Sequence, residues 1–86
     1  MRVMLMVQDV YHHRPACVGV LAKYKDGDKP AKAVRDRVDR WWLVEAESAN
    51  EARVAIEYAR LIPGSAVFES MKDGHKARIL ASGGRS

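Results

Sequence analysis

The chain has 86 residues, of which 48% are hydrophobic and 30% charged, and its formal net charge is +4 at pH 7. This length allows one domain, and the composition is that of a folded globular protein rather than a disordered chain. So small a domain buries only about 60–65% of the surface that its unfolded chain exposes. We therefore expect modest stability, with a contribution from an oligomer or a partner. The weak positive charge permits contact with nucleic acid or an acidic protein and requires neither.

The cysteine content and the start of the chain bear on the compartment. Cys17 is the only cysteine, which excludes an internal disulfide framework and is typical of a reducing compartment. The first apolar run ends at Asp9, is too short to span a membrane, and lacks the small-residue cleavage region of a signal peptide. We expect a cytoplasmic protein with no membrane segment, in which residues 1–82 form one domain and residues 83–86 a flexible tail.

Two strands are predicted in the first third of the chain. Residues 1–11 show a period-two apolar pattern, which is typical of a strand. The segment at 12–15, His-His-Arg-Pro, interrupts it, because proline cannot donate a hydrogen bond to a neighbouring strand. Residues 17–25 form the second predicted strand, and the turn-forming segment at 26–30, Asp-Gly-Asp-Lys-Pro, closes it.

Residues 31–40 are compatible with two structures. As a helix, they place Val34 and Val38 on one stripe with one of the tryptophans that follow; as a strand, they place the same valines on one face. We predict a long third strand that pairs with the second, because residues 41–47 are clearly strand-like and no helix end precedes them. A short helix at residues 30–37 is the alternative.

The best-marked helix follows the tryptophans. Ser48 and Glu51 have the spacing of a capping box, in which the Ser48 hydroxyl accepts from the Glu51 amide and the Glu51 carboxylate reaches back to the amide of Ser48. The helix is predicted from Ala49 to Ile62, because Pro63 ends it. The centre of its apolar side is formed by Ala52, Ala55, Ile56, Ala59 and Ile62.

Residues 65–71 and 76–81 are the fourth and fifth predicted strands, joined by an Asp73-Gly74 hairpin turn. The predicted fold class is therefore α+β. An antiparallel sheet of four or five strands packs one helix on one face, in the order β-β-β-α-β-β.

A single helix covers only one face of such a sheet, and both faces are predicted to carry apolar side chains. Trp41 and Trp42 are adjacent and must point to opposite faces, so one of them is expected outside the helix-covered core. One face is predicted to hold Val18, Val20, Tyr24, Val38, Trp42 and Val44. The other is predicted to hold Met4, Met6, Leu21, Trp41 and Leu43, mixed with Lys23, Lys25, Arg35 and Arg37. An exposed tryptophan among methionine, leucine and arginine side chains has the composition of an interface hot spot. The alternatives are a chain that curls so that both faces are covered, and a Trp41 that is half-shielded by arginine and lysine stems.

Because one helix leaves an apolar sheet face uncovered, we predict a non-enzymatic interaction protein. We expect it to dock the open sheet face on itself, as a homodimer, or on a larger protein. Its size and basic charge suit an inhibitor or adaptor of nucleic-acid-handling machinery, such as a phage or mobile-element accessory protein. The predicted protein-binding residues are Trp41, Leu43, Met4, Met6, Leu21 and Arg37.

The alternative function is a small RNA- or single-stranded-DNA-binding module. Sheets that bind single strands combine aromatic side chains with lysine and arginine, as the Trp41 face would do. The predicted nucleic-acid contacts are Arg35, Arg37, Lys23 and Lys25.

Catalytic and metal signatures are weak in this sequence. Asp9, His12, His13 and Cys17 are metal-ligand types, but adjacent histidines on an extended segment point apart, and a structural zinc site would need further paired ligands. Cys17 lies in an apolar strand pattern, as a small buried side chain does, rather than beside a base that would make it a nucleophile. We expect no catalytic residue, no metal, no cofactor and no small-molecule substrate.

Overall fold

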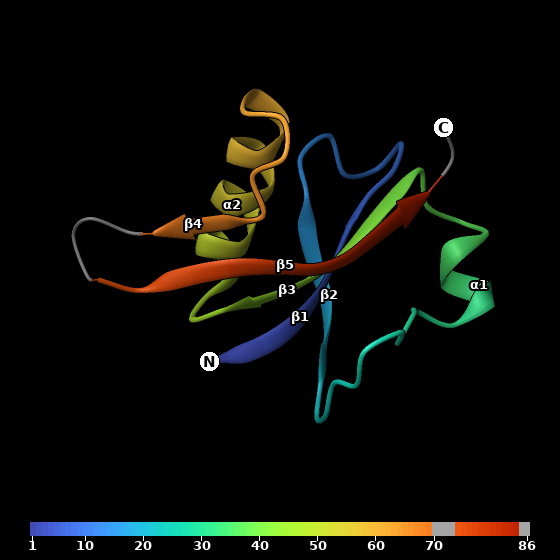
Figure 1. Cartoon of the computed structure of the whole chain (residues 1–86). Helices are drawn as coiled ribbons and strands as arrows, with labels where there is room; N and C mark the ends of the chain where they lie inside the picture. The colour runs from blue at the N-terminus through green and yellow to red at the C-terminus, as the bar shows by residue number, and fades with distance from the viewer. Residues whose placement is uncertain (70–73, 85–86) are drawn as a thin grey trace.

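The computed structural model describes residues 1–69 and 74–84, and these form an open antiparallel sheet with one main helix (Figure 1). The strands are β1 (Arg2–Gln8), β2 (Ala16–Leu21), β3 (Arg40–Ala46), β4 (Val67–Glu69) and β5 (Lys76–Gly84), in the sheet order β2-β1-β3-β5-β4. The helices are α1 (Lys32–Arg35), a single turn, and α2 (Ala49–Leu61). The predicted α+β class and antiparallel sheet are confirmed, and α1 adds one short helix before β3.

The register of β1 on β3 determines which side chains share a face. Met6 lies opposite Trp42 in this antiparallel pair. Since side chains alternate along a strand, Met4 and Met6 point to the same side as Trp42, and the prediction that placed them with Trp41 is wrong. The predicted pairing of the second and third strands is also wrong, because β1 lies between β2 and β3. β1 is apolar on both faces, which favours a place inside the sheet.

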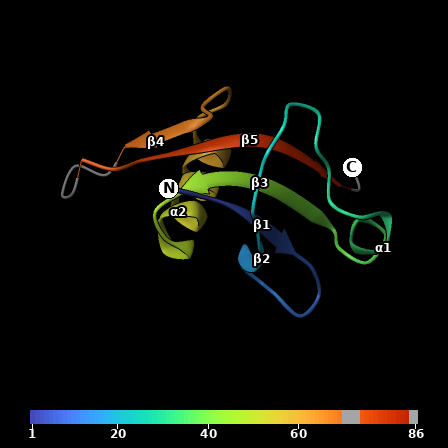
Figure 2. The same cartoon turned by 90° about the horizontal axis from the view of Figure 1, so that it is seen from below.

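The sheet is packed on both faces. Under α2, one core contains Met4, Met6, Trp42, Val44, Ala46, Ala52, Ala55, Ile56 and Ala77. On the opposite face a second core contains Val7, Val38, Trp41 and Leu43, with Val3, Leu5, Leu21, Tyr24, Val34 and Ala81 packed around it. The connection at residues 22–39, which includes α1, covers this second face, on the other side of the sheet from α2 (Figure 2).

The predicted strand at residues 31–40 is not formed, and the alternative of a short helix is confirmed. α1 is closed by backbone hydrogen bonds from the Arg35 amide to the Ala31 carbonyl (3.0 Å) and from the Asp36 amide to the Lys32 carbonyl (2.9 Å). In this conformation Val34 and Val38 pack on the second core. Burial of these valines against the sheet outweighs the weak local preference for a strand.

The predicted docking surface centred on Trp41 is therefore not exposed. Trp41 is only 6% exposed and Leu43 only 1%, because the connection at residues 22–39 provides a second cover, as the alternative of a chain that covers both faces requires. Met4 and Met6 are buried on the other face, under α2. Leu21 is half-buried at the edge of the second core.

Trp41 also requires a glycine on the neighbouring strand. Gly83 of β5 lies opposite Trp41, and a β-carbon at this glycine would lie 2.7 Å from Cζ2 of the indole ring. Gly83 and Gly84 thus belong to β5, and the flexible tail that was predicted from residue 83 starts too early. Residues 85 and 86 lie outside the described part of the chain.

α2 begins as its capping signal predicts and ends one residue early. The Ser48 hydroxyl accepts a hydrogen bond from the Glu51 amide (3.2 Å), but the Glu51 carboxylate lies 3.2 Å from Nδ1 of His75 instead of reaching back to the Ser48 amide. The last helical residue is Leu61, before Pro63. The predicted fourth strand is shorter, at Val67–Glu69, and the predicted turn includes Asp73, which lies outside the described residues. No helix in the described part of the chain is long and apolar enough to cross a lipid bilayer.

We expect Gly83→Ala to lower the free energy of unfolding by about 1–3 kcal/mol, because the added methyl group overpacks the indole of Trp41. Chemical denaturation measures this loss. Gly19→Ala is the matched control on the edge strand, since nothing lies within 4 Å of a β-carbon there. An equal effect of the two substitutions would contradict the close packing of Trp41 on Gly83.

Ser48→Ala is expected to lower the free energy of unfolding by about 1 kcal/mol, because it removes the side-chain acceptor for the Glu51 amide. Ser48→Asp keeps an acceptor at the same position and should retain most of this stability. Thermal unfolding of the two variants beside the native chain tests this, and equal stability of the alanine and native proteins would contradict the capping role.

Candidate functional site

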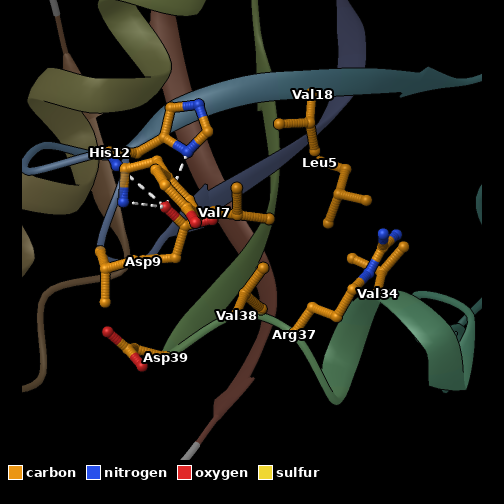
Figure 3. Close-up of a pocket in the computed structure, with 11 residues that line it drawn as sticks. Leu5, Val7, Asp9, His12, Val18, Val34, Arg37, Val38 and Asp39 are labelled. Carbon is orange, nitrogen blue, oxygen red and sulfur yellow. Dashed lines mark hydrogen bonds and ion pairs between the residues drawn. The ribbon is translucent and has the colours of Figure 1, made fainter.

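The connection at residues 22–39 covers the second sheet face only in part and leaves an apolar cavity of about 520 Å³ (Figure 3). Leu5 and Val7 of β1 and Val18 of β2 line it on the side of the sheet. Val34 and Val38 line it on the side of the connection. We call this space the β1–β2 cavity. Part of the predicted open face thus remains accessible. It lies over β1 and β2, at one edge of the sheet, and not over Trp41.

A β-bulge in the edge strand brings Val18 to this cavity. Leu5 pairs with Gly19, whereas Met6 pairs with Cys17, so Val18 is the extra residue between the two pairs. Bulges bend a strand and redirect a side chain at a sheet edge. Val18 is 49% exposed and lies beside the second core. The bulge therefore opens an apolar surface to solvent.

Polar side chains border the same cavity at the β1–β2 loop. Oδ1 of Asp9 accepts hydrogen bonds from the amides of Tyr11 (2.8 Å) and His12 (2.9 Å), and lies 2.9 Å from Nδ1 of the His12 ring (Figure 3). Desolvation of the Asp9 carboxyl raises its pKa, but the hydrogen bonds from His12 and Tyr11 and the charge of His12 outweigh this, so that the pKa lies below its ordinary value. Asp9 thus holds the loop at the border of the cavity.

An Asp–His pair of this kind also orients the base in many hydrolases, but covalent catalysis needs a nucleophile within reach. The residues that line the cavity include no serine, threonine or cysteine. Cys17 packs on the other face, against the core under α2, and its Sγ donates to the Gly19 carbonyl (3.3 Å). Within residues 1–69 and 74–84, no three His, Cys, Asp or Glu side chains are grouped to hold a metal ion. The pair therefore has a structural explanation as a loop clamp.

Of the predicted protein-binding residues, Arg37 lines the β1–β2 cavity, while its Nε donates to the Ala33 carbonyl (3.0 Å). The cavity residues Leu5, Val7 and Val18 were missed as site residues. The alternation along residues 1–11 placed Leu5 and Val7 on one face, but nothing local to the sequence showed that this part of the face stays open.

The four basic residues predicted to contact nucleic acid do not share a strand face. Arg35 belongs to α1, where its Nε donates to the Pro30 carbonyl (3.1 Å), and Arg37 follows that helix. Lys23 and Lys25 are exposed in the connection after β2. The predicted arrangement fails because residues 31–40 do not form the strand that would have aligned these side chains.

β2 is an edge strand with a basic surrounding. Among the described strands it pairs only with β1, so one side of its backbone is open to a further strand. The chain from residue 11 to residue 25 contains Arg14, Lys23 and Lys25 and no acidic residue. Arg14 forms an ion pair with Glu57 of α2 (3.0 Å). The open edge thus lies beside the cavity, with Arg14 near one end and Lys23 and Lys25 near the other. Asp9 and Asp39 also line the cavity.

Comparison of the chain with protein-family models, with curated proteins and with solved structures gave no match.

We expect acid to release the β1–β2 loop through Asp9. Its pKa in the folded state is below the ordinary value, so the ionised carboxylate stabilises the folded loop at pH values above the ordinary carboxyl pKa of about 4. That contribution is lost as the pH falls through the folded pKa. An NMR titration should show the amides of Tyr11 and His12 shifting together in this acid range.

Asp9→Asn is the matched control, because it keeps a side-chain oxygen that accepts from these amides and cannot ionise. The acid shift of the Tyr11 and His12 amides should disappear in this variant. Persistence of the shift would show that another group controls the loop.

Proposed function

We propose that this protein is a non-enzymatic interaction protein that binds an extended, acidic and apolar segment of a larger protein. The segment would add a strand beside β2 and place one apolar side chain in the β1–β2 cavity. The observation on which this proposal depends is the position of that cavity directly beside the open edge of the sheet.

Strand addition to an open edge is a recurring mode of peptide recognition, in which backbone hydrogen bonds supply affinity and pockets for alternate side chains supply specificity. β2 offers both features. Its backbone is open on one side, and Val18 is at once an edge-strand residue and part of the cavity lining. A strand added beside β2 would direct every second side chain to the cavity side. The volume of about 520 Å³ is within the range of about 300–1,000 Å³ that ligand pockets occupy.

The charge around β2 favours an acidic partner over a second copy of the chain. In an antiparallel pair of two β2 strands, Arg14 of one copy would approach Lys23 and Lys25 of the other. Like charges on paired strands destabilise the pair, whereas aspartate or glutamate at these places would be attracted. A foreign segment with one large apolar residue suits the cavity, and acidic residues at its ends would lie beside Arg14, Lys23 and Lys25.

The biological role that best fits this mode is that of an inhibitor or adaptor. A domain that occupies a segment of a larger protein acts by competition or by bridging, and needs no catalytic group for either. The half-buried thiol of Cys17 suits a reducing environment, so we place the protein in the cytoplasm.

Peptide selection tests this proposal directly. A library of random decapeptides displayed on phage is selected on the purified native chain, and enriched sequences should contain one large apolar residue flanked by aspartate or glutamate. A synthetic peptide of the enriched sequence is then titrated into Val18→Lys and Val67→Lys. We expect Val18→Lys to weaken binding at least about tenfold, which corresponds to about 1.4 kcal/mol, because it places a charge in the apolar cavity.

Val67→Lys is the matched control, since Val67 is an equally exposed valine (45%, against 49% for Val18) on the opposite edge strand, β4. Binding should survive there. N-methylation of every second peptide residue should abolish binding when the methylated amides face β2. Methylation of the other set should leave binding intact, as strand addition requires. Equal losses in the two lysine variants, or no enrichment of acidic peptides, would contradict the proposal. Sedimentation of the native chain as a dimer that Val18→Lys dissociates would assign the edge to a second copy instead.

A further inference from the structure

A second polar feature lies on the other face of the sheet, where two arginines meet over one tryptophan. Arg40 begins β3, and Arg60 lies in the last turn of α2. Cζ of Arg40 is 5.7 Å from the centre of the Trp42 ring system, and Cζ of Arg60 is 4.9 Å from it. Trp42 is 4% exposed, whereas both arginines are exposed. The fold thus concentrates two positive charges at the surface of the core under α2.

Neither arginine forms an ion pair with a carboxylate of the described residues. Glu57, one turn before Arg60, is paired with Arg14. Arg60 instead donates to the side-chain oxygen of Gln8. Desolvation of the Arg60 guanidinium and the charge of Arg40 lower the pKa of Arg60, against the opposing effect of Glu57. The two guanidiniums therefore repel each other without a described anion between them.

A cavity of about 380 Å³ adjoins this arginine pair. Ser65, in the loop after α2, and Ser82 of β5 add hydroxyl groups to its lining. Ala59 and Ile79 supply an apolar wall. One cavity thus combines two guanidiniums, two hydroxyl donors and an apolar surface, and we call it the Arg40–Arg60 pocket.

We infer that the Arg40–Arg60 pocket binds the phosphoryl group of a small organic phosphate ester. A phosphoryl group carries about −1.5 to −2 charges at pH 7, which matches two guanidiniums, whereas a carboxylate matches only one. The planar N–H groups of arginine suit phosphate oxygens, and the serine hydroxyls can donate further hydrogen bonds. The pocket volume exceeds that of a phosphoryl group alone, so the apolar wall is available to the organic part.

A single strand of nucleic acid is a poorer occupant of this pocket. Such strands bind along basic grooves and stack their bases on open aromatic faces. The ring of Trp42 is buried and is covered by the two guanidiniums, which leaves no face for a base. The pocket is also separate from the β1–β2 cavity, because the two lie on opposite faces of the sheet. The inference therefore does not depend on the proposed function.

Phenyl phosphate, inorganic phosphate and benzoate test this inference at constant ionic strength, with ¹H–¹⁵N NMR of the native chain as the readout. We expect saturable shifts at the amides of Ser65 and Ser82 and at Nε–H of Arg60. Phenyl phosphate should bind more tightly than inorganic phosphate, because its ring meets the apolar wall. Benzoate has the same ring with a single negative charge and should bind at least about tenfold more weakly.

Arg40→Gln and Arg60→Gln should each weaken phenyl phosphate binding at least about tenfold. Arg2→Gln is the matched control, since it removes the same charge at an exposed site near the other end of the sheet strands, opposite Ala46. Because no side-chain hydrogen bond of Arg40 is found in the described residues, Arg40→Gln is expected to fold even if Arg60→Gln does not.

Three outcomes would overturn the inference. The first is the absence of saturable shifts, or shifts in the glutamine variants as large as in the native chain. The second is benzoate binding as tightly as phenyl phosphate, which would indicate a site for one negative charge. The third is binding of a single-stranded oligonucleotide that Arg2→Gln weakens as much as Arg40→Gln, with no response to phenyl phosphate, which would indicate diffuse contact with a nucleic-acid backbone.

Discussion

The structure depends on the burial of two adjacent tryptophans on opposite faces of one central strand. β3 must be covered on both sides, because Trp41 and Trp42 cannot share a face. α2 covers the side of Trp42, and the connection at residues 22–39 covers the side of Trp41. The described residues form no second long helix, and a connection with one helical turn covers the face of Trp41 instead. The closeness of Trp41 to Gly83 shows how tightly this second layer and the strands around it are packed.

The two covers differ in extent, and this difference produces the candidate docking site. α2 has 13 residues and α1 has 4, so the second face is sealed around Trp41 and Val7 and left more open over Leu5 and Val18. The open region coincides with the edge of the sheet, where the bulge at Val18 adds to it. An apolar surface beside unpaired strand edges is a liability in a protein that has no partner, since it invites aggregation. The docking proposed above would cover this surface.

The Trp42 side of the sheet is shielded from solvent in a different way. Here α2 packs on the core, and the rim of the tryptophan is shielded by guanidinium groups instead of by further apolar residues. The cation–π contacts give each arginine a favourable position but bring two like charges together. Gln8 links this side to the β1–β2 loop, since it accepts from Arg60 and donates to the His13 carbonyl (2.7 Å). Through Gln8, the arginine pair over Trp42 is thus connected to the loop at the border of the β1–β2 cavity.

Local sequence patterns determined the elements with their own chemical signals. Ser48 and Pro63 bounded α2, the alternation of apolar residues marked β1 and β3, and the adjacent tryptophans required two apolar faces. The place of β1 inside the sheet, the second cover and the bulge at Val18 were decided only by the tertiary structure. The physical reason is that these features depend on contacts between residues far apart in the chain. Residues 31–40 have no strong preference of their own, so burial of Val34 and Val38 against a sheet formed elsewhere selects their conformation, and with it the part of the sheet that stays open.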